Sequence, residues 1–233
     1  MWDWAQRGLR QARIGFAVPS AVTLVAIFGI GSSAASQSAQ IVPRDALVGG
    51  RGYSQWTAAY WRWRDSLHRV TGNGTSCLSA SHGPVWFLGS SQEGIVITRN
   101  CSIPAGRYIM IAGPSTDCST VNKPPYYAKT TAGLVRCARR GWRKTPGELR
   151  LTLDGLALQP PGYVLRTTAF RFQMPAHNNE FFAPGPTAGR EADYGYATIL
   201  PPLSPGSHTL MGVGRYKNYP YPPEKVTYHL TVR

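Results

Sequence analysis

The last residues of the chain alternate between apolar and polar side chains, the pattern of a β-strand with one buried face. In "VTYHLTV" (226–232), Thr227, His229 and Thr231 fall on one side and four apolar residues on the other. The sequence contains 19 prolines and 25 glycines, and many of them separate short segments that have the pattern of a β-strand. Short strands separated by proline and glycine predict a mainly β fold, and we expect an antiparallel β-sandwich of the jelly-roll or immunoglobulin-like type. The runs that predict strands cover residues 85–88, 94–99, 106–112, 149–153, 163–172, 194–200, 207–214 and 226–232.

One segment has the periodicity of an α-helix instead. In residues 53–70, "YSQWTAAYWRWRDSLHRV", bulky side chains recur every three or four positions, and we expect this N-terminal amphipathic helix to pack on the sandwich. Trp61 lies off this face, where it could stack on a sugar ring or a base, or simply cover a neighbouring side chain. The bulky residues are Tyr53, Trp56, Tyr60, Trp63, Leu67 and Val70.

The first 35 residues have the layout of a secretory signal peptide. Three arginines precede an uncharged run at 14–30, and small residues that suit cleavage after Ala35 follow it. The alternative is an uncleaved membrane anchor, because the run approaches the length that spans a bilayer. Residues 36–52 lack periodicity and end in "GGRG", which predicts an extended lead-in to a single domain at 53–233. We therefore expect a secreted or cell-envelope protein, or the extracellular domain of a single-pass one.

Four cysteines, Cys77, Cys101, Cys118 and Cys137, predict two disulfides, because an even number is typical of exported domains. Three pairings are possible. We favour Cys77 with Cys101 and Cys118 with Cys137, since each pair would close a short loop between neighbouring strands. The sequence has no Cys-x-x-Cys motif, no close Cys/His cluster and no glycine loop that would cradle a phosphate before a helix. We therefore predict neither a metal ion nor a cofactor.

The chain is strongly basic, with a formal net charge of +14. Such a charge attracts anionic partners, for example wall polymers, membrane surfaces or nucleic acid, although no feature favours specific nucleic-acid recognition. The densest cluster, "RCARRGWRK" (136–144), surrounds a tryptophan with cations, which suits an anionic polymer; a solvated loop tethered by a disulfide would look the same. The candidate binding residues are Trp61, Arg139, Arg140, Trp142, Arg143 and Lys144.

No motif in the sequence identifies an enzyme. The Gly-x-Ser-x-Gly elbow of serine hydrolases is absent, and the five histidines are scattered singly. A catalytic carboxylate pair would have to come from predicted loops and turns, of which 177–196 is the best candidate for a functional loop. The acids in such regions are Glu93, Asp117, Glu180, Glu191 and Asp193. We therefore predict no catalytic residues; the alternative is a hydrolase site drawn from Asp117, Glu180, His82 and His208.

The order of several motifs resembles a group of uncharacterised exported bacterial proteins, many of them actinobacterial. These proteins share a Cys, Gly-x-Val-Trp-Phe-Leu, Cys-x-Val-Pro-Ala-Gly order and a closing Leu-Ser-Pro-Gly-x-His strand pair. The matching stretches here are "CLSASHGPVWFL", "RNCSIPAG", "DCST", "LVRCARR", "LDG", "PPLSPGSHTL" and "VTYHLTV". The resemblance implies a secreted β-rich domain and supplies no reaction.

The sequence as a whole predicts a non-enzymatic exported protein of the cell envelope or extracellular space. Its basic surface would bind an anionic polymer or surface. The alternative is an extracellular hydrolase that acts on polysaccharide or peptide.

Overall fold

β-Strands dominate the computed structural model, which describes residues 40–68, 75–89, 96–177, 179, 187–217, 220 and 222–233. The mainly β prediction is therefore confirmed. The elements in chain order are α1 (Tyr53–Asp65), β1 (Ser79–His82), β2 (Val85–Leu88), β3 (Val96–Ile103), β4 (Tyr108–Ser119), α2 (Thr131–Lys144), β5 (Gly147–Leu153), β6 (Leu156–Ala157), β7 (Tyr163–Arg166), β8 (Phe170–Gln173), β9 (Ala188–Leu200), β10 (Gly206–Tyr216) and β11 (Glu224–Val232).

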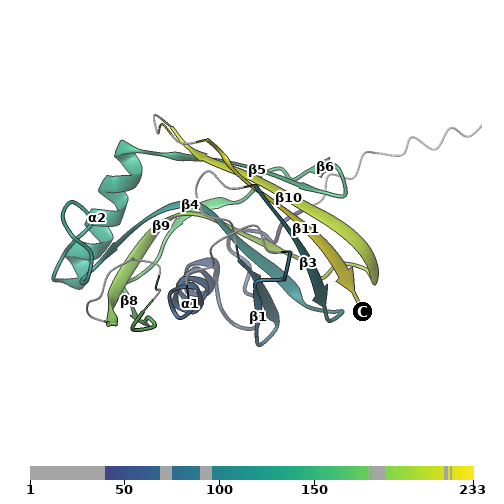
Figure 1. The fold of residues 1–233 in the computed structure, drawn as a ribbon, viewed down its shortest axis with the longest axis horizontal. Coiled ribbons are helices and arrows are strands. Elements are labelled where there is room, and N and C mark those ends of the chain that lie inside the picture. The colour runs from purple at the N-terminus through teal and green to yellow at the C-terminus, as the bar shows by residue number, and fades with distance from the viewer. Residues whose placement is uncertain are drawn as a thin grey trace, which may run out of the picture. The chain divides into compact units, whose positions relative to one another are not determined.

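The strands form two sheets (Figure 1). One has the order β1-β2-β4-β9-β7, with β8 added beside β9, and the other has the order β3-β11-β10-β5-β6. Most neighbours are antiparallel, but β2 runs parallel to β4, and β3 runs parallel to β11. These two pairs correct the expectation of a purely antiparallel fold. Between β2 and β4 the chain crosses to the other sheet as β3 and then returns, so it enters β4 in its original direction.

The main hydrophobic core lies between the two sheets. Ile109, Ile111 and Leu200 come from the first sheet. They pack with residues of the second sheet that include Leu151 and Leu210. Full burial of one such side chain contributes about 1.5–3 kcal/mol, so this shared core holds the sheets face to face.

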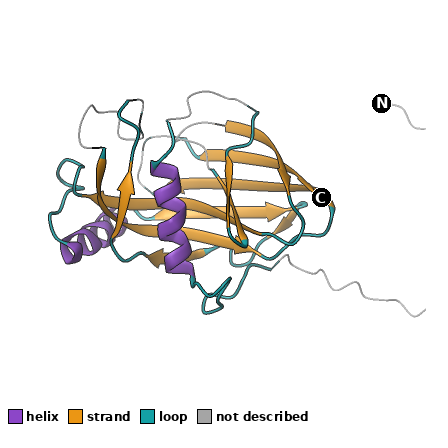
Figure 2. Cartoon of the chain, turned by 90° about the horizontal axis from the view of Figure 1, so that it is seen from below, coloured by secondary structure: helices purple, strands orange, loops and turns teal. Residues whose placement is uncertain are grey.

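Helix α1 covers the opposite face of the first sheet. Its Trp56, Tyr60 and Trp63 are buried and pack around Phe87 of β2. Figure 2 shows this helix crossing the strands. The Tyr60 hydroxyl donates to the carbonyl of Leu88 at 2.9 Å, so its polar end is satisfied inside the core. The helix lies within the predicted range 53–70 and ends at Asp65; residues 69 and 70 lie outside the described part.

The segment before α1 also packs on the first sheet. Ile41, Val42 and Val48 are buried, and the Val42 amide donates to the carbonyl of Ile199 at 2.8 Å. Contacts group Gln37–Arg233 into one unit, so the predicted lead-in at 36–52 joins the domain almost entirely. The predicted signal peptide or anchor, 1–35, lies outside the described residues.

Both favoured disulfides are present. Cys77 pairs with Cys101 and Cys118 pairs with Cys137, a bonding state typical of an oxidising, extracellular compartment. Neither described helix has the length and hydrophobicity needed to cross a bilayer.

Helix α2 occupies residues for which the sequence predicts no regular structure. Thr130 caps its start, with the side-chain hydroxyl accepting from the amide of Gly133 at 3.1 Å. Only Leu134, Cys137 and Ala138 are buried, and the Cys118–Cys137 disulfide ties this face to β4. The buried stripe is short and made partly of small residues, so the amphipathic pattern of this helix comes mainly from its cations. The basic cluster is therefore a helix face rather than a loop.

The long antiparallel pair β4–β9 carries both helices. Between Ala112 and Ser115 a β-bulge shifts the register, so Met110 and Ala112 face α1, whereas Cys118, six residues past Ala112, faces α2. Because β4 extends to Ser119 and β9 starts at Ala188, three acids expected in loops or turns lie in strands. These acids are Asp117, Glu191 and Asp193.

Gly195 of β9 is required at the point where the strands come closest. A Cβ at this position would lie 2.4 Å from the Cα of Ser115 and 2.6 Å from the carbonyl oxygen of Pro114. We expect Gly195→Ala to lower the free energy of unfolding by about 2–4 kcal/mol through overpacking, measured by chemical denaturation. Gly52→Ala is the control, because its Cβ would meet only a Leu47 methyl at 3.8 Å. Equal stability losses in the two variants would contradict the close approach.

Candidate functional site

Beyond the first turn of α2, every exposed side chain is cationic. The helix contains no acidic residue, and its five cations are exposed while its apolar face lies on β4 and β9. None of these cations takes part in an ion pair with another described residue. Figure 1 shows α2 at one end of the two sheets. The five cations are Arg136, Arg139, Arg140, Arg143 and Lys144.

The two candidate tryptophans pack against neighbouring rings. Trp142 lies between α2 and the sheet, 5.8 Å from the ring of Tyr196 and 6.1 Å from that of Tyr194. Trp61 meets Tyr60 edge-on at 5.3 Å. Both are half-buried, so the structure gives them packing roles and leaves the cations of α2 as the accessible part of the predicted site.

A small basic hollow continues the α2 face toward β7. Arg139 of α2, Arg166 at the end of β7 and Arg44 of the N-terminal segment line a space of about 240 Å³. Its remaining lining includes the ring of Tyr194. The hollow therefore brings together cations from three distant parts of the chain, which sequence spacing alone does not reveal.

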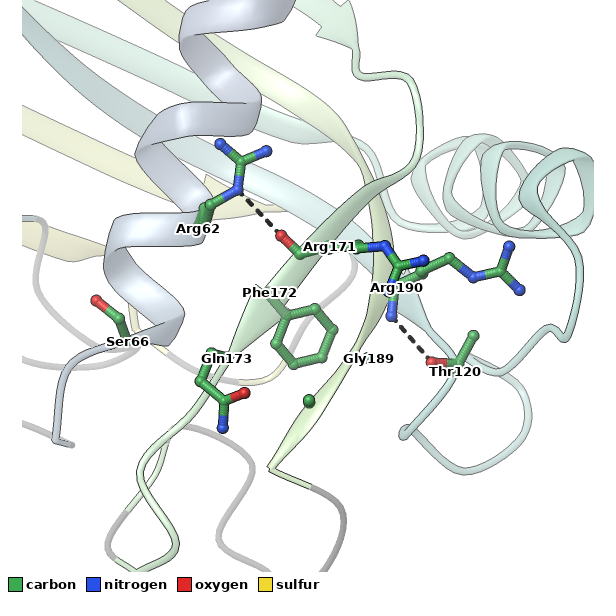
Figure 3. Close-up of a pocket in the computed structure, with 9 residues that line it drawn as sticks. Arg62, Ser66, Thr120, Arg171, Phe172, Gln173, Gly189 and Arg190 are labelled. Carbon is green, nitrogen blue, oxygen red and sulfur yellow. Dashed lines mark hydrogen bonds between the residues drawn. The ribbon is translucent and has the colours of Figure 1, made fainter.

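A larger hollow lies beside β8 and β9 and is also lined by arginines. It has a volume of about 780 Å³, and Arg62, Arg171 and Arg190 contribute to its walls (Figure 3). These residues are not among the binding residues predicted from the sequence, because they stand alone among apolar and polar neighbours. Only the strand pairing and the approach of α1 bring them together.

Most of the described acidic groups lie away from these basic surfaces. Glu148 of β5 pairs with Arg215 and with Lys217, and the pKa of its carboxyl is lowered by those partners. Asp154 lies 2.7 Å from Nδ1 of His208, a contact that raises the pKa of the imidazole. Both groups belong to the five-stranded sheet.

Three further acids are buried between α1 and the first sheet. Glu191 and Asp193 are each 2% exposed, and Asp65 at the end of α1 is also buried. Burial raises the pKa of Glu191 well above its usual value, and nearby Asp65 and Asp117 raise it further. Burial also raises the pKa of Asp193 to about 7, although the side chains of Ser115 and Trp61 partly oppose this. Both carboxyls therefore carry protons at acidic pH.

Asp117 connects this buried group with the surface. It stands directly opposite Asp193 in the β4–β9 register, and its Oδ2 accepts a hydrogen bond from Asn122 at 2.8 Å. It also lines a hollow of about 520 Å³ together with Lys123 and Tyr216. Asp117 therefore has both an open space and a protonatable neighbour, Asp193.

The other alternative catalytic residues lie in different surroundings. His82 stacks on Phe87 at 4.4 Å, and burial followed by the charge of Arg51 lowers its pKa. His208 on β10 is held by Asp154 and by the Ser204 carbonyl at 2.9 Å. Their described contacts do not include Asp117. Glu180 and Glu93 lie outside the described residues.

Comparison of the chain with protein-family models, curated proteins and solved structures finds no match. Within the described ranges, no three His, Cys, Asp or Glu side chains are arranged to hold a metal ion. The site must therefore be interpreted from its own geometry.

The raised pKa of Asp193 predicts a pH-dependent stability. A carboxyl whose folded pKa exceeds its unfolded value of 3.8 stabilises the fold at low pH, and this contribution is lost as the pH rises toward 7. We expect Asp193 to lower the unfolding free energy by on the order of 3 kcal/mol across this interval, and Asp193→Asn to remove this part of the fall while the part due to Glu191 remains.

Denaturant titrations at several pH values measure this effect. Asp45→Asn, which alters an exposed carboxyl near the N-terminal end of the domain, should keep the wild-type dependence. An unchanged pH profile in Asp193→Asn would show that Asp193 is ionised in the fold.

Proposed function

We propose that this protein is exported and binds an anionic polymer of the cell envelope through the outer face of α2. The observation that carries the proposal is a helix with five exposed cations, no acid and no described ion pair. Leaving so many like charges together destabilises the unbound helix slightly. An anionic partner removes that repulsion and releases counterions, which favours binding.

A polymer suits this face better than a small molecule. The cations are spread along an exposed helix rather than around an enclosed cavity, so successive charges of a chain can meet successive turns. The Cys118–Cys137 disulfide holds the helix on β4, which limits the loss of conformational freedom on binding. An anionic membrane surface would be attracted to the same face by the same charges.

Export and fold type belong to the same proposal. The basic start, the uncharged run and the small residues before position 36 support a cleaved signal peptide, and the two disulfides support an oxidising destination. The motif order that resembles exported bacterial proteins supports it further. Most strand neighbours are antiparallel, the pairing found in jelly-roll and immunoglobulin-like sandwiches.

Wall binding gives a direct test. We expect Arg139→Gln/Arg140→Gln/Arg143→Gln to reduce retention on isolated cell wall about tenfold or more at low salt, because three contacts to anionic groups are lost. Co-sedimentation with intact wall, and with wall stripped of its anionic polymers, measures the effect. Wild-type retention should disappear at about 0.5 M salt, where charges are screened.

The matched control removes the same charge from the other sheet. Arg150→Gln/Lys225→Gln/Arg233→Gln changes three exposed cations on or beside β5 and β11 and should retain near wild-type binding. Equal losses in the two triple variants would show that net charge, rather than α2, drives retention. Salt-resistant retention of the wild type would contradict the proposal.

A second candidate is a hydrolase acting on polysaccharide or peptide, favoured by Asp117. This carboxyl lines a hollow opposite Asp193, whose pKa of about 7 suits proton donation near neutral pH. Turnover of wall glycan or peptide should then be lost in Asp117→Asn and kept in Asp45→Asn, measured as release of reducing ends or amines. Absence of turnover by the wild type would reject this candidate.

A further inference from the structure

Arg171 and Arg190 stand directly opposite each other on β8 and β9. Side chains in such positions share one face of the sheet, and like charges there repel. Arg171 is exposed and Arg190 is half-buried, so water screens the second charge only in part. Neither arginine forms an ion pair with any described residue. The strand pair therefore keeps two positive charges side by side with no ion-pair partner among the described residues.

The structure fixes the guanidinium of Arg190 and the backbone of Arg171 in place. Nη2 of Arg190 donates to the Lys129 carbonyl at 2.7 Å, and Nη1 donates to the hydroxyl of Thr131 at 3.2 Å. On the other side of β8, Nε of Arg62 donates to the Arg171 carbonyl at 3.0 Å. These contacts use only part of the hydrogen-bonding capacity of the guanidinium groups. The remaining donors of Arg190 are therefore held in place before any ligand arrives, beside the exposed guanidinium of Arg171.

Small and polar residues complete the hollow around the pair. Thr120 accepts from the Arg190 amide at 3.0 Å through its hydroxyl oxygen, which leaves the hydroxyl proton free to donate. Gly189 lies against Thr120 and Phe172, where a Cβ would come within 2.8 Å of the threonine oxygen. Figure 3 shows Arg171 and Arg190 extending from neighbouring strands, with Thr120 and Gly189 beside them. The hollow of about 780 Å³ has room for a charged group and the unit that carries it.

We propose that Arg171, Arg190 and Thr120 form a binding site for a phosphate group. A phosphate monoester offers several oxygen acceptors and up to two negative charges, which match two guanidinium groups and a hydroxyl donor. A carboxylate carries one charge on two oxygens and would leave one arginine uncompensated. Binding relieves the repulsion between Arg171 and Arg190. The two like charges that destabilise the free protein therefore favour the complex.

This site deepens the proposed function and rests on it for the biological ligand. The cations of α2 would attract an anionic polymer along its length, and the strand arginines would select phosphate as the charged group. A terminal phosphate monoester on a polymer or on a lipid headgroup presents the same charged group. Separate probes distinguish these two sources.

The test is calorimetric titration of the protein with inorganic phosphate, glycerol 3-phosphate and acetate, and co-sedimentation with phosphatidic acid vesicles. We expect the phosphate compounds to bind and acetate to fail. Arg171→Gln should weaken binding about tenfold or more, whereas Arg150→Gln, an exposed strand arginine of the other sheet, should leave it unchanged. Binding to vesicles alone, with loss in Arg171→Gln, would support the site and assign the phosphate to a lipid.

A second variant separates binding from folding. Arg171→Glu replaces the repulsion by an attraction, so it should raise Tm while abolishing phosphate binding. Phosphate should raise the Tm of the wild type but not that of this variant. Retained binding in Arg171→Glu, or equal binding of acetate, would overturn the phosphate site.

The two proposals fail separately. If no phosphate probe binds while wall retention stays intact, the strand site is wrong and the polymer function stands. If phosphate binds in an Arg171-dependent way while the α2 triple variant retains wall binding, the helix face is wrong and the strand site stands.

Discussion

The antiparallel pairing of β4 with β9 is the interaction on which the rest of the structure depends. One face of this pair supports α1 and the buried carboxyls, and the other supports the five-stranded sheet and α2. Asp117 and Asp193 meet across it, Cys118 holds the basic helix to it, and Arg190 extends from it. The pairing register of β4 and β9 therefore sets the geometry of each candidate site.

The sequence predicted the features that depend on residues close together in the chain. The alternation at 226–232 matches β11, and the aromatic spacing from Tyr53 falls on the buried face of α1. The disulfide pairing followed from short loops and is confirmed. Helix α2 was missed because its amphipathic pattern comes mainly from its cations, whereas its buried face has only three residues, two of them small. Asp193 was placed in a loop because a buried acid in a strand contradicts the usual alternation.

The candidate site was predictable only where its residues are neighbours in the chain. The cations around Trp142 form a visible cluster, although the tryptophan itself packs inward. Arg62, Arg171 and Arg190 come from three separate elements, and no spacing rule joins them. Burial of Glu191 and Asp193 separates negative charge from the surface, so the accessible surface is more basic than the composition implies. Long-range attraction to anions depends on that separation.

The bulge between Ala112 and Ser115 exchanges the faces of the sheet on which odd-numbered and even-numbered residues of β4 lie. Before it, even-numbered residues face α1; after it, odd-numbered residues take over that side. A β4 shorter by one residue here would exchange the two faces beyond it. The sulfur of Cys118 would then lie among carboxyls, and the carboxyl of Asp117 would lie under the basic helix. The one extra residue of the bulge thus keeps the buried carboxyls and the basic helix on opposite faces of the same sheet.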